Sequence, residues 1–433
     1  MASKKGLEAG ERVRVEKDGK AYEGVVLPAS EYAGANDLVL KLDNGYNIGV
    51  SVDGKSKITL LGKRTRVGKA VVKKEYSHST GLPEIAVLST GGTIASRIDY
   101  ETGGVKAEFS ASDIVASAPE LKEIANIDSE LIFNLMSEDL LMSDWKKIAS
   151  HVAAQVRKGK KGVIITHGTN TMHYSSAALS FALRNLGIPV VFTGAQRSSD
   201  RGSSDAFVNL VCSAKAAVSE IAEVQLCMHG SISDDYCFSH RGTKVRKMHT
   251  SRRDAFQSIN ASPLARIHAR GGIEFLTEEY NKRGSPGEKL KVVDDFEERT
   301  ALIYTYPNMR PDVLDWHVEQ GYKGLVLMGT GLGEVVPTKT KYSLIPSIKA
   351  AVKKGVPVVV ASQTIHGRVH PFVYANLRTL FIDSGAIPAQ DMTPETAFVK
   401  LAWVLPQAKG VEHVRELMME SVAGEISPQT PVL

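Results

Sequence analysis

The chain has 433 residues, 43% of them hydrophobic and 23% charged, and a formal net charge of +5. The length predicts about three domains with buried cores, and the small positive excess tolerates an acidic partner such as RNA without requiring one. No apolar run approaches the ~20 residues that span a bilayer, and the start has no apolar signal core, so we expect a protein that neither enters a membrane nor is exported. The three cysteines, Cys212, Cys227 and Cys237, lack Cys-x-x-Cys spacing, and we expect a reducing, cytoplasmic environment.

The first sixty residues differ in rhythm from the rest of the chain. Short alternating runs are separated by the dipeptides Asp18-Gly19, Asn44-Gly45 and Asp53-Gly54, which favour the positive φ angles of tight hairpins. The runs cover residues 12–16, 21–27, 38–42, 46–50 and 58–61. They predict a small antiparallel β barrel of the SH3 or Tudor type, within a domain of residues 1–75 that ends in a basic linker over 55–74. That linker is either a solvated tether, which we prefer, or a strip that contacts RNA.

From Pro83 onward, apolar strands alternate with amphipathic helices. Strands are expected to end near Leu88, Ile165, Phe192 and Cys227, with helices over 143–158, where Ser143 is the expected N-cap, and 205–220. This alternation predicts an α/β domain over residues 84–276, with a parallel sheet covered on both faces. A polar segment over 277–299 predicts a connection to a smaller α/β domain and tail over 300–433. Its expected strands are 301–304, 324–328 and 356–360, and its expected helices are 313–320, 343–354 and 394–405.

Two glycine turns rich in hydroxyl groups follow predicted strands. Residues 89–95 read Ser-Thr-Gly-Gly-Thr-Ile-Ala and residues 166–172 read Thr-His-Gly-Thr-Asn-Thr-Met. The carboxyl ends of parallel strands meet at one edge of a sheet, so the two loops predict one site. A lone Gly-Gly-Thr is more often a plain turn or a phosphate cradle, but this one lacks the motifs of a dinucleotide site or a P-loop. The loops therefore favour a threonine nucleophile, with glycine amides close to a carbonyl.

A threonine nucleophile needs a base, and residues 242–256 offer one. A lysine can accept a proton only when it is held neutral, by desolvation or by positive neighbours such as Arg246, Arg252 and Arg253. The composition of this segment leaves the choice between Lys244 and Lys247 open.

These segments, together with 247–251, 254–256, 191–197 and 205–210, resemble the signature segments of the bacterial-type L-asparaginase and glutaminase family, from Pro83 to Leu405. The resemblance implies an asparaginase-like fold of two α/β domains. It also implies Thr93 as the nucleophile and Thr169 with Lys247 as the activating pair. By the same resemblance, the substrate is bound by Gly92, Ser137 and Glu138, the last two at its α-carboxylate end.

Position 170 departs from the family pattern. The family has aspartate there, which helps to hold the substrate's α-ammonium and pairs with the lysine, whereas Asn170 carries no charge. The chain is then either a deliberately disabled form or a natural variant with changed chemistry; we prefer the former because the neighbouring motif residues are all in place. Tyr100 is the nearby candidate for the family's catalytic tyrosine, although it lies closer to Thr93 than the family spacing suggests.

The barrel, the core motifs and the tail together resemble the D-subunit family of the archaeal-type glutamyl-tRNA(Gln) amidotransferases. This resemblance implies a glutaminase that passes ammonia to an E subunit acting on Glu-tRNA(Gln), as a homodimer within a heterotetramer. It implies no cofactor on this chain, with ATP and Mg²⁺ in the partner subunit. The alternatives are a free-standing L-asparaginase and a catalytically silent scaffold.

Three histidines and an asparagine complete the candidate residues. His366 and His370 have the spacing of a metal pair, but Gly367 and Pro371 favour a loop and no metal site is expected. His167 is expected to be a structural hydrogen-bonding residue rather than a base. Asn308 is either a turn residue or one that resembles a side chain donated across the family's dimer interface.

Overall fold

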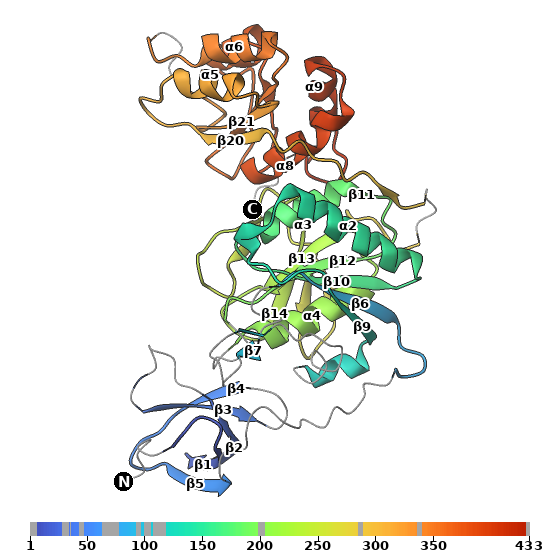
Figure 1. Cartoon of the computed structure of the whole chain (residues 1–433), viewed down its shortest axis with the longest axis vertical. Helices are drawn as coiled ribbons and strands as arrows, with labels where there is room; N and C mark the ends of the chain where they lie inside the picture. The colour runs from blue at the N-terminus through green and yellow to red at the C-terminus, as the bar shows by residue number, and fades with distance from the viewer. Residues whose placement is uncertain are drawn as a thin grey trace.

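The computed structural model describes residues 7–27, 34, 36–42, 47–62, 78–91, 97–98, 105–106, 118–197, 204–284, 289–335 and 340–429. An amino-terminal sheet, a large α/β unit and a smaller carboxy-terminal unit follow one another along the chain (Figure 1). Within the described residues, no helix has the length and apolar character required to cross a membrane.

The amino-terminal unit is a five-stranded antiparallel sheet in the order β4-β3-β2-β1-β5, which confirms the five predicted strands. The strands are β1 (Arg12–Lys17), β2 (Lys20–Val26), β3 (Asp37–Leu42), β4 (Asn47–Ser51) and β5 (Lys57–Gly62). Alternate residues such as Val13, Val15, Leu38 and Leu40 point to one side and form a small core of their own.

The turns of this sheet only partly follow the prediction. Asp18 (φ 50°) and Gly19 (φ 75°) form the expected tight hairpin between β1 and β2. The hairpin expected at Asp53-Gly54 is wrong, because β4 pairs with β3 whereas β5 crosses over to pair with β1. Asp53 Oδ1 instead accepts hydrogen bonds from the amides of Lys55 and Ser56. The linker expected over residues 55–74 is also wrong in its first part, because residues 57–62 form strand β5. Residues 63–74 of that linker and the dipeptide Asn44-Gly45 lie outside the described residues.

The large unit contains an eight-stranded sheet in the order β18-β17-β14-β13-β12-β10-β6-β9. The predicted strands β6, β10, β12 and β13 run parallel, as expected. Strand β9, which was not predicted, adds a fifth parallel strand, and the unpredicted β14, β17 and β18 continue the sheet antiparallel. The bounds are β6 (Glu84–Ser89), β9 (Asn126–Leu131), β10 (Gly162–Thr166), β12 (Val190–Thr193), β13 (Val224–His229), β14 (Tyr236–Arg241), β17 (Ala265–His268) and β18 (Ile273–Phe275).

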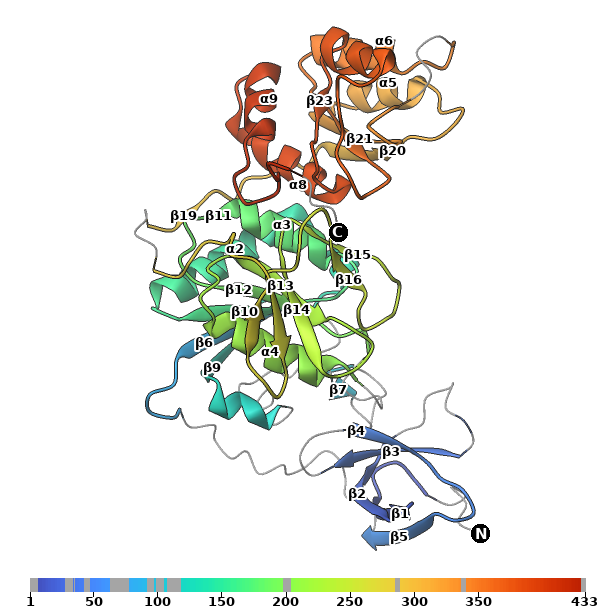
Figure 2. The same cartoon turned by 180° about the vertical axis from the view of Figure 1, so that it is seen from behind.

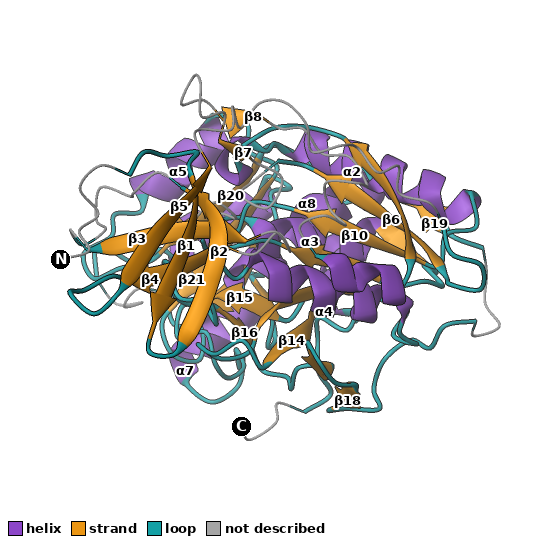
Figure 3. Cartoon of the chain, turned by 90° about the horizontal axis from the view of Figure 1, so that it is seen from below, coloured by secondary structure: helices purple, strands orange, loops and turns teal. Residues whose placement is uncertain are grey.

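Helices cover both faces of the parallel strands. Ala86 and Leu88 of β6 pack into the cluster that contains α2 (Met142–Arg157) and α3 (Met172–Ala182). Ile85 and Val87 pack into the cluster that contains α4 (Ala206–Val218). In Figure 3, β6 and β10 accordingly lie between α2 and α4. A strand buried on both faces explains the continuous apolar run in the sequence.

Helix α2 begins one residue earlier than expected. Its N-cap is Leu141 rather than Ser143, and Asp144 in the first turn accepts a hydrogen bond from the Leu141 amide at 3.0 Å. The N-cap assignment of Ser143 was therefore wrong, because a carboxylate three residues after Leu141 satisfies the free amide of the helix end.

Short elements complete the large unit. They are β7 (Arg97–Ile98), β8 (Val105–Lys106), β11 (Leu183–Arg184), β15 (Val245–Lys247), β16 (Phe256–Ser258), β19 (Lys291–Val292) and the 3-10 turns Pro119–Glu123 and Ser137–Asp139. The three cysteines are buried and form no disulfide with one another.

The carboxy-terminal unit is a parallel sheet in the order β20-β21-β22-β23, with helices around it. Its predicted strands and helices are all present. The strands are β20 (Thr300–Tyr304), β21 (Gly324–Gly329), β22 (Val358–Ser362) and β23 (Ile387–Pro388). The helices are α5 (Asp312–Glu319), α6 (Ile345–Lys353), α7 (Ala375–Arg378), a π-helical turn (Thr379–Asp383), α8 (Pro394–Val404), a 3-10 turn (Leu405–Gln407) and α9 (Val411–Met419).

Helix α8 joins the two α/β units. Trp403 of α8 stacks on Phe181 of α3 with ring centroids 5.6 Å apart, and both lie in the core cluster that also contains Val326 and Val359 of the carboxy-terminal sheet. Figures 1 and 2 show α8 at the boundary between the units from both sides. The position of the smaller unit is thus fixed by a shared apolar core.

Candidate active site

The two threonine-rich loops leave neighbouring parallel strands. Ser89, at the end of β6, pairs in register with Thr166 at the end of β10. The Thr90 amide and the Thr90 hydroxyl both donate to the Thr166 carbonyl at 3.0 Å. The loops therefore start side by side at one edge of the sheet, where α/β enzymes bind their ligands.

The first loop begins with a close backbone approach. Gly91 has φ +108°, and a Cβ at this position would lie 2.4 Å from the Leu135 carbonyl oxygen, so only glycine fits. Thr93, Gly92 and Tyr100 lie outside the described residues. The nucleophile, substrate-binding and tyrosine roles of these residues stay predictions.

The amine of Lys247 lies beside the second loop. Lys247 ends strand β15, and its Nζ donates to Thr169 Oγ1 and to Asn170 Oδ1, each at 2.9 Å. Lys244, the other candidate base, points elsewhere and forms a buried ion pair with Asp391 at 2.8 Å. Of the two lysines that the sequence left open, Lys247 is therefore the one at the predicted site.

The electrostatics at Lys247 favour a base. Burial lowers the pKa of the Lys247 amine below its ordinary value, and the negative charge of Glu138 only partly opposes this effect. The pKa of Glu138 is also lowered, mainly by a backbone hydrogen bond to its carboxylate and then by the Ser137 hydroxyl. The site thus combines an ionised carboxylate with an amine that is shifted toward its neutral form.

A third segment, Ser137–Asp139, packs against the second loop. The Thr171 hydroxyl donates to the Ser137 carbonyl at 2.6 Å, and the Ser137 hydroxyl donates to Glu138 Oε2 at 3.0 Å. A Cβ at Gly168 would lie 2.8 Å from Ser137 Cβ, so the two segments are in contact through a glycine. The structure therefore brings together Ser137, Glu138, Thr169, Asn170 and Lys247.

Asn170 connects the amine to the carboxylate. Its Oδ1 accepts from Lys247, and its Nδ2 donates to Glu138 Oε2 at 3.4 Å. An aspartate at this position would place a second carboxylate oxygen next to Glu138. The neutral amide avoids that repulsion but supplies no charge for Lys247 or for a substrate ammonium.

His167 in the same loop has a structural environment. Burial lowers the pKa of His167 to about 4, and Nδ1 lies 2.6 Å from the Gly168 carbonyl oxygen. A group that is neutral across the physiological pH range and bonded to its neighbouring backbone positions the loop. This agrees with the structural role expected for it.

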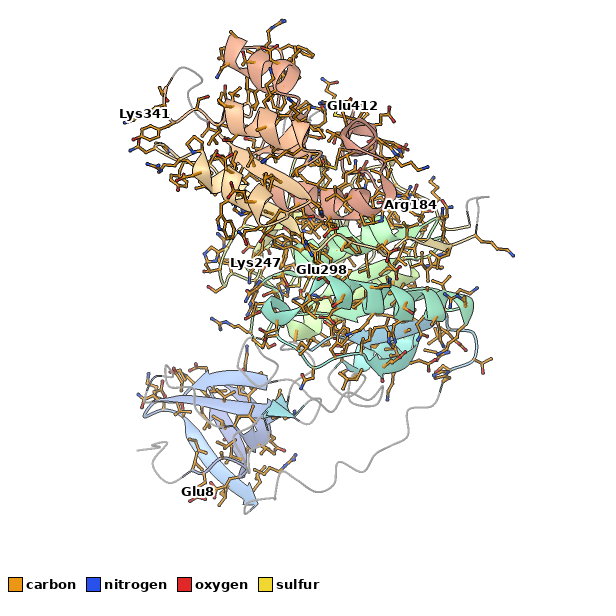
Figure 4. All side chains as sticks on the ribbon, turned by 45° about the horizontal axis from the view of Figure 1, so that its top comes forward. Glu8, Arg184, Lys247, Glu298, Lys341 and Glu412 are labelled. Atoms are coloured by element: carbon orange, nitrogen blue, oxygen red, sulfur yellow. The ribbon has the colours of Figure 1, made fainter. Side chains whose placement is uncertain are left out.

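The acidic residues that hold the segment bearing Lys247 were not anticipated from the sequence. Arg246 Nε donates to Glu395 Oε1 at 2.8 Å, and Asp391 pairs with Lys244. Both carboxylates come from residues 391–396, whose sequence is that of an ordinary helix start. In Figure 4, Lys247 is labelled where the large unit meets the carboxy-terminal unit.

Two weaker candidates are placed as well. In the part of the chain that the structure describes, no group of three or more His, Cys, Asp or Glu side chains could hold a metal ion. His370 Nδ1 accepts from the Phe372 amide at 3.3 Å within a loop. Asn308 has φ +70° and lies in a turn closed by the Met309 amide and the Tyr306 carbonyl, whereas its role at a dimer interface stays a prediction.

Known protein families match the three units in order. Residues 7–61 match the GatD N-terminal domain, residues 84–280 match the asparaginase N-terminal domain, and residues 299–418 match the glutaminase/asparaginase C-terminal domain. The D subunit of the glutamyl-tRNA(Gln) amidotransferase of Pyrococcus abyssi is 49% identical over 98% of this chain and 96% of its own length. Its counterpart in Pyrococcus furiosus is 50% identical over the same shares.

Solved structures of asparaginases match the two α/β units. The thermostable L-asparaginase from Thermococcus kodakarensis is 31% identical with a TM-score of 0.71, and covers 80% of this chain and 100% of its own. L-asparaginase I from Vibrio cholerae is 30% identical with a TM-score of 0.69, and covers 80% of this chain and 99% of its own. The predicted asparaginase-like fold is confirmed.

Proposed function

Because the chain belongs to the family of glutamyl-tRNA(Gln) amidotransferase D subunits, we propose that it is a glutaminase subunit, which releases ammonia from glutamine for a partner that converts Glu-tRNA(Gln) to Gln-tRNA(Gln). The observation that carries this proposal is the contact of Lys247 Nζ with Thr169 Oγ1 at the edge of an asparaginase-like sheet. A lysine of lowered pKa beside a hydroxyl is an arrangement that can take a proton from a nucleophile.

The proposed reaction proceeds in two steps. Thr93 Oγ attacks the side-chain carbonyl carbon of glutamine, and its proton passes to the pair formed by Thr169 and Lys247. The C–N bond then breaks, and the leaving nitrogen takes up a proton and departs as ammonia. Water hydrolyses the resulting ester on Thr93 and releases glutamate. Ser137 and Glu138 bind the amino acid end of the substrate, with Gly92 beside its carbonyl.

Asn170 reduces this activity in the proposed mechanism. The position is next to Lys247 and Glu138, where an aspartate would attract both the lysine and a substrate ammonium. A neutral amide leaves Glu138 as the carboxylate that faces the substrate's charged end. We therefore expect a weakened glutaminase, in accord with a disabled form rather than with a natural variant of changed chemistry.

The surrounding assembly is part of the proposal. We propose an E subunit as partner, which holds ATP and Mg²⁺ and acts on Glu-tRNA(Gln), and a homodimer of this chain within a heterotetramer in the cytoplasm. A free-standing L-asparaginase is less well supported, because the solved asparaginases cover 80% of this chain whereas the D subunits cover 98%. The matched amino-terminal unit makes the difference.

The experiment combines assembly with turnover. The chain is expressed with and without an archaeal E subunit, separated by size exclusion, and assayed for ammonia from glutamine and from asparagine. We expect a larger complex and release from glutamine, increased by Asn170→Asp. A chain that never recruits the E subunit contradicts the amidotransferase assignment. If Asn170→Asp also releases no ammonia from either amide, the scaffold alternative is supported.

A further inference from the structure

The strand that carries Lys247 is attached to the start of helix α8 in the carboxy-terminal unit. We propose that Glu395, supported by Asp391, is a positioning residue that sets the Lys247 amine against Thr169, so that the smaller unit controls the geometry of the base. The inference rests on the proposed amide hydrolysis, in which Lys247 takes up the proton. It concerns residues that act through Arg246 and Lys244 and do not touch the substrate.

Of the contacts between this segment and residues 391–396, the one between Arg246 and Glu395 lies closest to Lys247 in the sequence. Arg246 Nε donates to Glu395 Oε1 at 2.8 Å, and the Glu395 side chain is only 7% exposed. The other oxygen, Oε2, has no hydrogen-bond partner in the described part of the chain. The Glu395 carboxylate therefore depends on Arg246, and a charge-assisted bond of this kind holds the adjacent backbone firmly.

Two more contacts fix the residues that directly precede this strand. Lys244 and Asp391 form an ion pair at 2.8 Å in which both side chains are almost fully buried. The Thr396 hydroxyl donates to the Thr243 carbonyl at 2.9 Å. Residues 243, 244 and 246 are thus each bonded to the segment 391–396.

The alternation of a strand explains how these contacts aim Lys247. Successive side chains point to opposite sides of a strand, so within β15 Arg246 lies on one side and Lys247 on the other, and Lys244 directly precedes the strand. Arg246 contacts Glu395 of α8 and Lys244 contacts Asp391 just before α8, whereas Lys247 contacts Thr169 and Asn170. A shift or rotation of the strand would therefore move the amine away from the hydroxyl.

The segment 391–396 is itself rigid. Thr393 is the N-cap of α8 and accepts a hydrogen bond from the Thr396 amide, Pro394 occupies the first turn, and Glu395 follows it. Asp391 is bonded in turn by Asn260, whose Nδ2 donates to the Asp391 carbonyl at 2.9 Å. Glu395 is thus held in the first turn of a capped helix, and Asp391 is held by its hydrogen bond from Asn260.

The test compares Glu395→Ala, Glu395→Gln, Arg246→Ala and the double variant Glu395→Ala/Arg246→Ala in the Asn170→Asp chain bound to its partner. Glu395→Ala is expected to lower kcat by about 10- to 100-fold, because a shift of about 1 Å in a reacting group has effects of that size. KM for glutamine is expected to change less than about threefold, because no substrate contact is lost. Glu395→Gln keeps the acceptor oxygen and is expected to retain most of kcat. The double variant is expected to match the single one, since both remove the same contact.

Lys400→Met is the matched control. Lys400 also lies on α8 and forms a buried ion pair, with Glu425 at 2.6 Å; its hydrogen bonds go to the carbonyls of Met418 and Glu420, and none goes to residues 243–247, all of which the structure describes. The variant is expected to have a lower unfolding temperature, with kcat within about twofold of the parent. An equal loss of kcat in Lys400→Met and Glu395→Ala would overturn the inference, because general destabilisation would then explain both. An unchanged kcat in folded Glu395→Ala would overturn it as well.

A second measurement does not depend on turnover. Trace acetylation with acetic anhydride, read out by peptide mass spectrometry, gives the reactivity of the Lys247 amine as a function of pH. Glu395→Ala is expected to change this reactivity at least about threefold, whereas Lys400→Met leaves it unchanged. If the Asn170→Asp chain, in which these variants are made, releases no ammonia, the proposed function fails, and this labelling alone decides the positioning role. An identical Lys247 profile in Glu395→Ala and the parent would then overturn it.

Discussion

The amine of Lys247 and the hydroxyl of Thr169 are 78 residues apart in the chain and lie 2.9 Å apart in space. Two independent features bring them together. Thr169 is in the loop that follows strand β10, and Lys247 ends the first strand of the short β15–β16 hairpin, which is held by the carboxy-terminal unit. The proposed chemistry depends on this contact.

Replacement of Lys247 should abolish most of the activity. Lys247→Met removes the amine, and Lys247→Arg keeps the charge but cannot become neutral, so both should lower kcat by about 10²- to 10⁴-fold, the usual contribution of a general base. The measurement is ammonia release from glutamine at saturating substrate. Equal loss in both variants identifies the neutral amine as the active species, whereas full activity in Lys247→Arg would contradict this role.

Asn170→Asp should increase activity and shift its pH dependence. A carboxylate next to Lys247 favours the charged amine, so it should raise the pKa of Lys247 above its present, burial-lowered value. Since the base is active when neutral, activity rises with pH through that pKa, and the rise should move to higher pH in the variant. KM for glutamine should fall, because the α-ammonium gains a negative partner. A rise at unchanged or lower pH would count against the proposed role of the lysine.

Much of the site could be predicted because each catalytic loop directly follows an apolar strand. The pairing of Ser89 with Thr166 follows from that pattern, since neighbouring parallel strands end at the same edge. The choice between Lys244 and Lys247 could not be made from composition, because both lie in one basic run and only the direction of each side chain separates them. That direction is set by Asp391 and Glu395, which are about 150 residues away.

The errors in the fold have related causes. The antiparallel strands β14, β17 and β18 were missed because polar residues such as His240 and Arg266 interrupt their apolar pattern. Ser143 looked like an N-cap, but the Asp144 carboxylate satisfies the amide of Leu141. In each case the local sequence is compatible with more than one structure, and a long-range strand pairing or a neighbouring side chain determines which one forms.

Lys244 should contribute to stability in addition to its part in holding the segment that carries Lys247. Lys244→Met removes the nearest positive partner of the buried Asp391, which keeps the Ser427 amide and the Arg368 guanidinium at 3.7 Å, and loss of one member of a buried pair costs up to about 3–5 kcal/mol. Urea unfolding monitored by circular dichroism gives the free energy of unfolding. The double variant Lys244→Met/Asp391→Leu should recover much of the loss, because no charge is then buried alone. A wild-type free energy of unfolding in Lys244→Met would contradict the structural role.

Acid should destabilise the large unit through its buried histidines. Burial lowers the pKa of His240 to about 3 and that of His167 to about 4, against 6.5 for an unperturbed histidine. As pH falls below 6.5, the unfolded state binds protons that the folded state excludes. Stability is therefore lost from pH 6.5 downward, by about 1.4 kcal/mol per pH unit for each such group.

Urea unfolding at pH 7, 6 and 5 measures this loss. His240→Gln should reduce the slope by the share of one group. A slope that His240→Gln does not alter would show that His240 is not excluded from protonation in the folded state.

Gly168→Ala tests the contact between the second loop and the segment Ser137–Asp139. The added methyl group would lie 2.8 Å from Ser137 Cβ and 2.9 Å from Ser137 Oγ, so that segment has to move. We expect KM for glutamine to rise by about tenfold, as for a loss of about 1.4 kcal/mol of binding, while the chain remains folded. Gly272→Ala is the control, because an added Cβ there has no atom within 4 Å. An unchanged KM in Gly168→Ala would contradict the assignment of Ser137 and Glu138 to the substrate.

The most direct measurement of the central claim is ammonia release from glutamine by the complex with its E subunit, in a set of three chains: the parent, Asn170→Asp, and Asn170→Asp/Lys247→Met. We expect low release from the parent, higher release from Asn170→Asp, and release at background from the double variant. Release that is the same in all three chains, or undiminished by Lys247→Met, would contradict the role of Lys247 as the base.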